Sequence, residues 1–372
     1  MMKRFAQVAF VGAVILVTAV VAVNLKEKGK ASDPYADFSV FAKVYNVILA
    51  RYVEPVDESF LMEGAYRGAV ESVFDQNSYI PAKMMENLEP RLMMTGRIGI
   101  DVIKRGGYAQ VVHVFPGSEA ESKGIEPGTI LQQINGQYTW DLPLFAIRAL
   151  LKGNPGDPVD ITYYEMTRGE DVDESFRYEE LPSPSAAIVD VDGVEALRVH
   201  SFSPETMTKA SEFSASHGYL ILDLRYTQDK HYQEMLNICA ALSGQPVEAT
   251  RRRKEGNQTM KSADMKPLGV PVYLLTSSFT MNAADVMSNL LSGHKDIKVV
   301  GGRLSGKAFE SELFQLQDGA YVEMATTLYA PCVEDGLKPD VRSFIDDSEI
   351  ADTLRDLLKQ NGTEADGTEA AA

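Results

Sequence analysis

The stretch VPVYLLTSSFTMNAADVMSNLLSGHKDIKVVGGRLSGK, residues 270–307, decides the fold of the second half of this chain. Its first six residues are largely apolar and predict a buried strand. Small polar residues follow over 276–282, and apolar residues at helical spacing then predict a helix over 283–292. A second apolar run, 297–302, predicts another strand that leads into Lys307.

A turn of small polar residues between a strand and a helix is a common position for a catalytic nucleophile. The first amides of the helix can stabilise an oxyanion at such a turn. A lysine that returns nearby can act as the base, because burial lowers the pKa of a lysine. The stretch therefore indicates a nucleophile position near the start of the 283–292 helix and a base position at Lys307.

These residues resemble the carboxyl-terminal processing peptidases, also called tail-specific proteases. The family carries a Ser-Ala-Ser-Ala-Ser-Glu segment at a helix start, with the middle serine as nucleophile, and a Thr-Phe-Gly-Lys-Gly segment with the lysine base. Residues 303–307 match the lysine segment, which puts Lys307 at the base position. Asp285 matches the acidic residue three positions after the nucleophile, which puts Asn282 at the nucleophile position, 25 residues before Lys307.

Three positions depart from the family pattern. Asn282 has no hydroxyl group to deprotonate, and Ser311 stands where the family has a glutamine. The family's Asn-Pro-Gly-Gly turn, which helps form the oxyanion hole, is replaced by residues 226–230, with Asp229 and Lys230 in place of glycines. Loss of a serine nucleophile typically lowers turnover on the order of a millionfold. The resemblance therefore implies a peptidase scaffold without the chemistry.

A small β-rich domain is predicted over residues 95–181, with strands over 98–102, 109–115 and 130–134. The order of strands, short helix and glycine turns across 117–136 resembles a PDZ domain. The carboxylate-binding loop of that fold then corresponds to Arg97, Ile98, Gly99 and Ile100, and residues 143–151 form the helix of the groove. The resemblance implies that a peptide C-terminus adds a strand there. The alternative is a domain that only packs against its neighbour.

The remaining pattern gives the domain organisation. Residues 31–94 predict a helical region, with two helices joined near 53–57, and its apolar stripe is typical of core or of a contact in a homo-oligomer. Alternating strands and helices over 182–346 predict a parallel α/β core, of the ClpP/crotonase type by resemblance. Residues 347–372 predict a last helix and a disordered acidic tail.

The first 30 residues are expected to be a membrane anchor or a signal. Residues 5–25 are almost wholly apolar, interrupted by Gln7, Thr18 and Asn24. About 20 such residues span a bilayer core, so an uncleaved transmembrane helix is expected, with a cleaved signal peptide as the alternative. Together with the family resemblance, this predicts a body that faces the periplasm or the cell exterior.

Composition excludes some classes of partner. The chain has 36 basic and 53 acidic residues, a formal net charge of −17, which disfavours nucleic acid. No metal or cofactor is expected, because the five histidines have no metal-ligand spacing. Cys239 and Cys332 are expected to be buried thiols, or a disulfide in an oxidising compartment. The basic run 251–254 is expected in a solvated loop.

Three functions follow from the sequence. The first is a non-catalytic relative that binds polypeptide C-terminal tails or partner proteases, with Lys307 hydrogen-bonded to Asn282. The second is an active serine-type endopeptidase that uses a relocated hydroxyl with Lys307 as base. Its candidate hydroxyls are those of Ser277, Ser278 and Thr280. The third is a structural scaffold in a protease assembly.

Overall fold

The computed structural model describes residues 36–165, 169–181, 184–343, 347–360 and 362. The predicted anchor over 5–25 lies outside these residues. Within the described ranges, every helix is too short or too polar to cross a membrane. The chain divides into two compact units, residues 1–65 and 66–372.

The described part of the first unit contains helix α2, Ala36–Arg51, and the start of α3, Glu58–Val73. Asp57 caps α3 by accepting a hydrogen bond from the Ser59 amide at 2.8 Å. The Tyr45 hydroxyl donates to Glu58 at 2.7 Å and so ties α2 to the start of α3. Two helices joined near 53–57 are therefore confirmed. Most large apolar side chains of α2 are exposed in the single chain, and the contact that its stripe makes stays a prediction.

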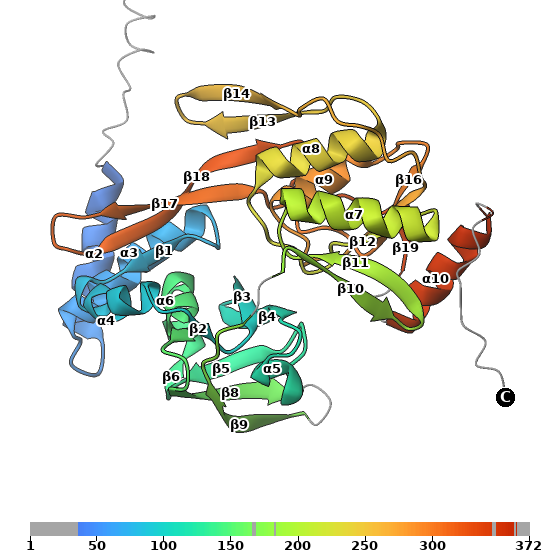
Figure 1. Cartoon of the computed structure of the whole chain (residues 1–372). Coiled ribbons are helices and arrows are strands. Elements are labelled where there is room, and N and C mark those ends of the chain that lie inside the picture. Colours follow the sequence, from blue (N-terminus) through green and yellow to red (C-terminus); the bar gives the residue numbers. More distant parts are fainter. Residues whose placement is uncertain (1–35, 166–168, 182–183, 344–346, 361, 363–372) are drawn as a thin grey trace, which may run out of the picture. The chain divides into compact units, whose positions relative to one another are not determined.

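The second unit is built on a six-stranded sheet with strand order β10-β11-β12-β15-β16-β19 (Figure 1). Neighbours from β11 to β19 are parallel, and β10 runs antiparallel at one edge. The strands are β10 Ala186–Val191, β11 Val194–Val199, β12 Leu220–Asp223, β15 Val272–Thr276, β16 Ile297–Gly301 and β19 Val341–Arg342. The predicted parallel α/β core is confirmed.

Four helices accompany this sheet: α7 Pro204–His217, α8 Tyr232–Ser243, α9 Ala283–Leu291 and α10 Asp347–Gln360. Local signals set their ends. At α7, the Ser203 side chain accepts from the Thr206 amide, Pro204 occupies the first turn, and Gly218 ends the helix in the left-handed conformation. All residues of β12 and β15 are buried, and they form the centre of the largest apolar core.

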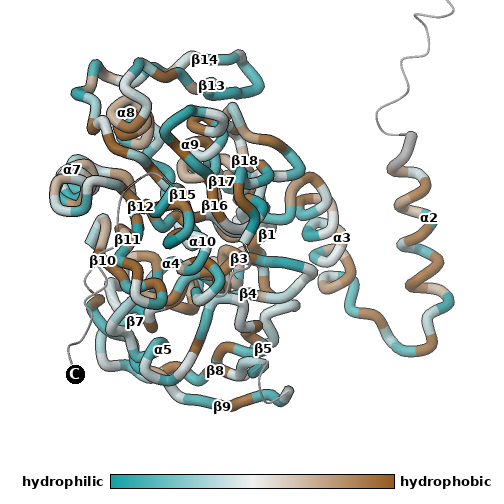
Figure 2. The backbone as a smooth tube through the Cα atoms, turned by 90° about the vertical axis from the view of Figure 1, so that its right-hand side faces the viewer, coloured by the Kyte–Doolittle hydropathy of each residue, from teal (hydrophilic) through white to brown (hydrophobic). Residues whose placement is uncertain are grey.

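A second sheet contains β1 Ser78–Ile80, β13 Glu248–Arg253, β14 Gly256–Lys261, β17 Phe309–Gln315 and β18 Tyr321–Ala330. The predicted hairpin at residues 318–319 joins β17 to β18. The expectation of a loop over 251–254 is wrong, because most of this run lies in β13. Arg251 pairs with Glu310 at 3.1 Å, and opposite charges across a sheet stabilise even a polar strand. The β13–β14 hairpin is largely hydrophilic in Figure 2.

A third sheet has the order β3-β4-β5-β8-β9, with β6 Gln137–Tyr138 beside β5. Its main strands are β3 Ile100–Arg105, β4 Tyr108–Val114, β5 Ile130–Ile134, β8 Pro158–Glu165 and β9 Glu170–Arg177. Helices α5 Glu119–Ser122 and α6 Leu144–Leu150 are close to their predicted positions. Helix α4, Ala82–Leu92, packs against α6. A two-stranded ladder joins β2, Gly96–Arg97, to β7, Lys152–Gly153.

The strand predicted over 98–102 is interrupted at Gly99. This residue has φ +90, and a Cβ atom there would lie 2.1 Å from the Ser118 Cβ, so only glycine fits. Strand β3 therefore starts at Ile100, after the chain has left β2.

Candidate functional site

Asn282 lies at the turn between β15 and α9, where the sequence predicts the nucleophile position. Its backbone has φ 54 and ψ −124, and the residue is 3 % exposed. Residues other than glycine rarely adopt a positive φ, and such strain clusters at functional sites. The strained strand-to-helix turn on which a nucleophile is presented is therefore present in the backbone.

The carboxamide of Asn282 joins three segments of the chain. Its Nδ2 donates to the Gln228 carbonyl at 2.9 Å, and its Oδ1 accepts from the Phe309 amide at 3.2 Å. The Asn282 amide donates to the Lys307 carbonyl at 2.7 Å. Both polar ends of this side chain are thus used for internal hydrogen bonds.

Lys307 does not hydrogen-bond the Asn282 side chain, so that prediction is wrong. Its Nζ donates to both carboxylate oxygens of Asp75, at 2.6 and 2.7 Å, and lies 5.5 Å from the centre of the Phe74 ring. A charge-assisted pair with a carboxylate is stronger than a hydrogen bond to a neutral amide. The ammonium group is therefore held by the segment that follows α3.

The 226–230 turn, which replaces the family's glycine-rich turn, packs its backbone against the start of α9. The Asp229 carbonyl accepts from the Ala283 amide at 3.0 Å. In the nucleophile turn of hydrolases, the amide after the nucleophile is an oxyanion donor. The Asp229 carboxylate accepts from the amides of Phe202 and His231, each at 3.0 Å. The amide that would face an oxyanion is therefore already bonded.

Asp285 fixes the segment that carries Lys307. Its carboxylate is fully buried and accepts from the Gly306 amide at 2.8 Å and from the Ser305 hydroxyl at 3.2 Å. Burial raises the pKa of Asp285, although these donors oppose the rise. The Cys332 thiol also donates to it, at 3.3 Å. In the described chain the Cys239 and Cys332 thiols are free, so the disulfide alternative is wrong.

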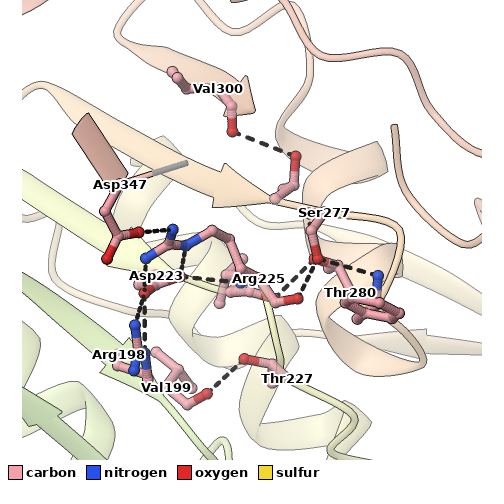
Figure 3. A network of polar contacts seen from close by, with 12 residues as sticks. Arg198, Val199, Asp223, Arg225, Thr227, Ser277, Thr280, Val300 and Asp347 are labelled. Carbon is pink, nitrogen blue, oxygen red and sulfur yellow. Dashed lines mark hydrogen bonds and ion pairs between the residues drawn. The ribbon is translucent and has the colours of Figure 1, made fainter. Parts of the chain in front are cut away.

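Two of the three hydroxyls predicted as relocated nucleophiles are engaged elsewhere. The Ser277 hydroxyl donates to the Arg225 carbonyl, and the Thr280 hydroxyl donates to the Leu224 carbonyl at 2.8 Å (Figure 3). Both side chains are fully buried. Ser278 is half-buried.

A buried ionic network holds the end of β12 (Figure 3). Asp223 pairs with Arg198 at 2.8 Å and with Arg225 at 2.9 Å, and Arg225 also contacts Asp347 at the start of α10. Burial raises the pKa of Asp223, but the two guanidinium groups outweigh this effect and hold the pKa well below its usual range. The network positions Tyr226, whose ring both arginines approach.

A cavity of about 510 Å³ opens beside Asn282, and we call it the Asn282 cavity. It is lined by Arg97, Ile100, Asp101, Val102, His113, Phe115, Arg148, Leu151, Lys152, Pro184, His200, Ser201, Tyr226, Gln228, Asp229, Lys230, Met281, Asn282 and Phe309. The predicted peptide-binding residues Arg97 and Ile100 therefore share one cavity with the predicted nucleophile position.

The other predicted site residues lie outside the lining found among the described residues. Ile98 and Gly99 are buried, and Lys307 faces Asp75 instead. Ser311 is half-buried in β17, next to a β-bulge.

Sequence reasoning missed two contributors to this cavity. Arg148 is the single charged residue of α6, and a charge in an otherwise apolar helix was a signal that could have found it. His200 lies with its ring centre 5.0 Å from that of His113. Burial lowers the pKa of His200 to about 4, and the neighbouring His113 adds to this effect. His200 is therefore neutral near pH 7.

The match to known families covers both halves of the chain. The profile of peptidase family S41 matches residues 194–343, and that of the activating protease CtpB N-terminal domain matches residues 5–82. The carboxy-terminal processing protease CtpA of Bacillus subtilis (strain 168) is 22 % identical, covering 93 % of this chain and 79 % of the relative. A carboxy-terminal-processing protease of Bartonella bacilliformis is 21 % identical, covering 80 % and 71 %.

Among solved structures, the photosystem II D1 C-terminal processing protease superimposes with a TM-score of 0.62 at 17 % identity. The match covers 81 % of this chain and 86 % of that protein. This likeness establishes the S41 peptidase α/β fold. The two profile matches, with the curated relatives, place the chain in the carboxy-terminal processing protease family, peptidase family S41.

Proposed function

We propose that this protein is a non-catalytic member of its family that binds the C-terminal tails of polypeptides, or of partner proteases, in the Asn282 cavity. One observation carries the proposal. At the nucleophile turn, the Asn282 carboxamide bridges Gln228 and Phe309, and the following amide, that of Ala283, donates to the Asp229 carbonyl.

Acyl transfer by a serine-type peptidase needs an attacking hydroxyl, a base and a pair of oxyanion donors. In this chain the attacking position, the base and one oxyanion donor are each engaged in an internal bond. The attacking position holds a carboxamide, the lysine is paired with Asp75, and the Ala283 amide is bonded to Asp229. These bonds favour binding over hydrolysis.

The cavity wall supports tail binding. Strand β3 lies at the edge of the third sheet, and its residues Ile100, Asp101 and Val102 line the Asn282 cavity. A peptide can extend a sheet by pairing with an edge strand, while side-chain pockets give specificity. The PDZ-like region over 95–181 would thus present the tail to the former catalytic centre.

The test combines an activity assay with a binding screen on the purified full chain. We expect no cleavage of an unfolded protein substrate, with an active protease as positive control. Turnover that disappears in Lys307→Ala would show that the chain is an active peptidase. A peptide-display screen is expected to return ligands with a free C-terminus. The absence of any carboxylate-dependent ligand would favour the structural scaffold.

We also propose that residues 5–25 anchor the protein, with its body on the periplasmic or outer side. The apolar length of this segment supports the proposal. Alkaline extraction of membranes should leave the full chain in the pellet, and added protease should digest its body from the outer side. Release of the chain into the supernatant would contradict the anchor.

A further inference from the structure

The Asn282 cavity gathers positive charge in an acidic chain. The formal net charge of the whole sequence is −17. The charged side chains of the lining are Arg97, Arg148, Lys152 and Lys230, against Asp101 and Asp229. The Asp229 carboxylate is already bonded to the His231 ring, at 2.7 Å, and to two amides. The wall near Asn282 therefore carries more cationic side chains than carboxylates that could pair with them.

Two of these cations lack a hydrogen-bond or ion-pair partner among the described residues. Within the described ranges, neither the Arg148 guanidinium nor the Lys230 ammonium donates a hydrogen bond or joins an ion pair. Burial lowers the pKa of Arg148 and that of Lys230, and the charge of Arg148 adds to the effect on Lys230. Two desolvated cations that repel each other are unfavourable unless an anion lies near them.

The Lys230 ammonium lies 4.5 Å from the centre of the Phe309 ring, on the segment that the Asn282 carboxamide also holds. Arg148 reaches the same region from α6. Glu323 of β18 acts on both cations from beyond ion-pair distance, and Asp101 acts on Arg148 in the same way. Glu310 also acts on Lys230, but it is paired with Arg251 at 3.1 Å. Within the described ranges, none of these carboxylates forms an ion pair with Arg148 or Lys230, so both cations can pair with the carboxylate of a ligand.

Further polar atoms in the wall lack partners. The His113 Nε2 and the Gln228 side-chain nitrogen are buried, and neither has a hydrogen-bond partner in the part of the chain that the structure describes. His113 as a whole is 4 % exposed. Buried polar groups nearly always have a hydrogen-bond partner in folded proteins. The two unpartnered atoms therefore indicate that the cavity binds a polar ligand.

We propose that Arg148 and Lys230 form an anion site that holds the terminal carboxylate of a bound polypeptide tail beside Asn282. This rests on the proposed tail-binding function and names its chemistry. The predicted loop at 97–100 is less suited to bind the carboxylate, because the Arg97 amide already donates to the Glu179 carbonyl at 2.9 Å and Ile98 is fully buried. The site thus binds the C-terminal carboxylate of a polypeptide at the place where a peptidase would bind the carbonyl group of the scissile bond.

The test measures binding of two fluorescent peptides to the full chain by fluorescence anisotropy. Both peptides are unstructured and have the same sequence with apolar final residues, but one ends in a free carboxylate and the other in a C-terminal amide. We expect the free acid to bind about 10- to 100-fold more tightly than the amide, the range for one charge-assisted hydrogen-bond pair. Lys230→Met and Arg148→Met should each reduce this preference about 10-fold or more. Lys230→Arg should keep it, and so should Lys254→Met, a matched loss of charge in the exposed β13–β14 turn.

A second readout needs no variant. The free-acid peptide should protect Lys230 from acetylation by an amine-reactive ester, measured by mass spectrometry, and should leave Lys254 unprotected. A full acid preference in both Lys230→Met and Arg148→Met, without protection of Lys230, would overturn this anion site while leaving tail binding intact. Failure of both peptides to bind the unaltered chain would overturn the proposed function itself.

Discussion

Replacement of Asn282 by alanine measures how much of the fold depends on its carboxamide. The change removes the bonds to the Gln228 carbonyl and the Phe309 amide and leaves both backbone groups without those partners. Each lost bond is worth about 1 kcal/mol, and an orphaned buried group adds a similar amount. The backbone at φ 54 and ψ −124 lies outside the left-handed helical region, so it is strained for alanine as it is for asparagine. We expect Asn282→Ala to lower the free energy of unfolding by about 3 kcal/mol.

The measurement is urea unfolding followed by circular dichroism, with the same slope assumed for all variants. Asn282→Gly loses the same hydrogen bonds but relieves the backbone strain, so its loss should be about 1 kcal/mol smaller. Asn257→Ala, in the exposed β14 strand, is the matched control and should change stability by less than about 0.5 kcal/mol.

A loss below about 1 kcal/mol in Asn282→Ala would refute the reasoning, because it would mean that the two hydrogen bonds are not structural. A larger loss in Asn282→Gly than in Asn282→Ala would show that the positive φ carries no strain.

Three other variants give independent tests. Asn282→Ser is expected to recover little turnover on an unfolded substrate, because the oxyanion amide stays bonded to Asp229, and full recovery would contradict this. Asp223→Ala leaves the Arg198 guanidinium unpaired and the buried Arg225 with Asp347 alone, and should lower the free energy of unfolding by about 3–5 kcal/mol, against less than about 0.5 for the surface control Asp352→Ala. Since the pKa of His200 falls from 6.5 to about 4 on folding, the unfolded chain binds more protons between these values, and stability should rise with pH there, by up to about 3 kcal/mol. His200→Gln should flatten that rise, and an unchanged pH profile would contradict it.

The turn around Asn282 could be predicted from sequence because its signals are local. Apolar runs of the right length and small polar residues between them place the strand, the turn and the helix. The family resemblance, through Asp285 and the 25-residue spacing to Lys307, then identifies Asn282 as the nucleophile position. The bonds made by these residues could not be predicted. Asp75, which holds Lys307, lies 232 residues earlier in the chain, and no local pattern indicates such a pair.

Two errors have similar physical causes. The run 251–254 has the polarity of a loop, but its arginines face Glu310 and Glu312 across the sheet, and only the folded chain shows that pairing. The strand predicted at 98 starts at Ile100 because Gly99 passes close to Ser118, a contact that alternation of apolar residues does not encode.

The central claim is that no hydroxyl of this chain attacks a peptide bond. The most direct measurement is intact mass spectrometry of the full chain after incubation with an unfolded substrate and with a serine-reactive fluorophosphonate, alongside product analysis. The account predicts an unmodified chain and an uncleaved substrate. A covalent adduct on any serine or threonine, formed together with cleavage products and lost in Lys307→Ala, would contradict it.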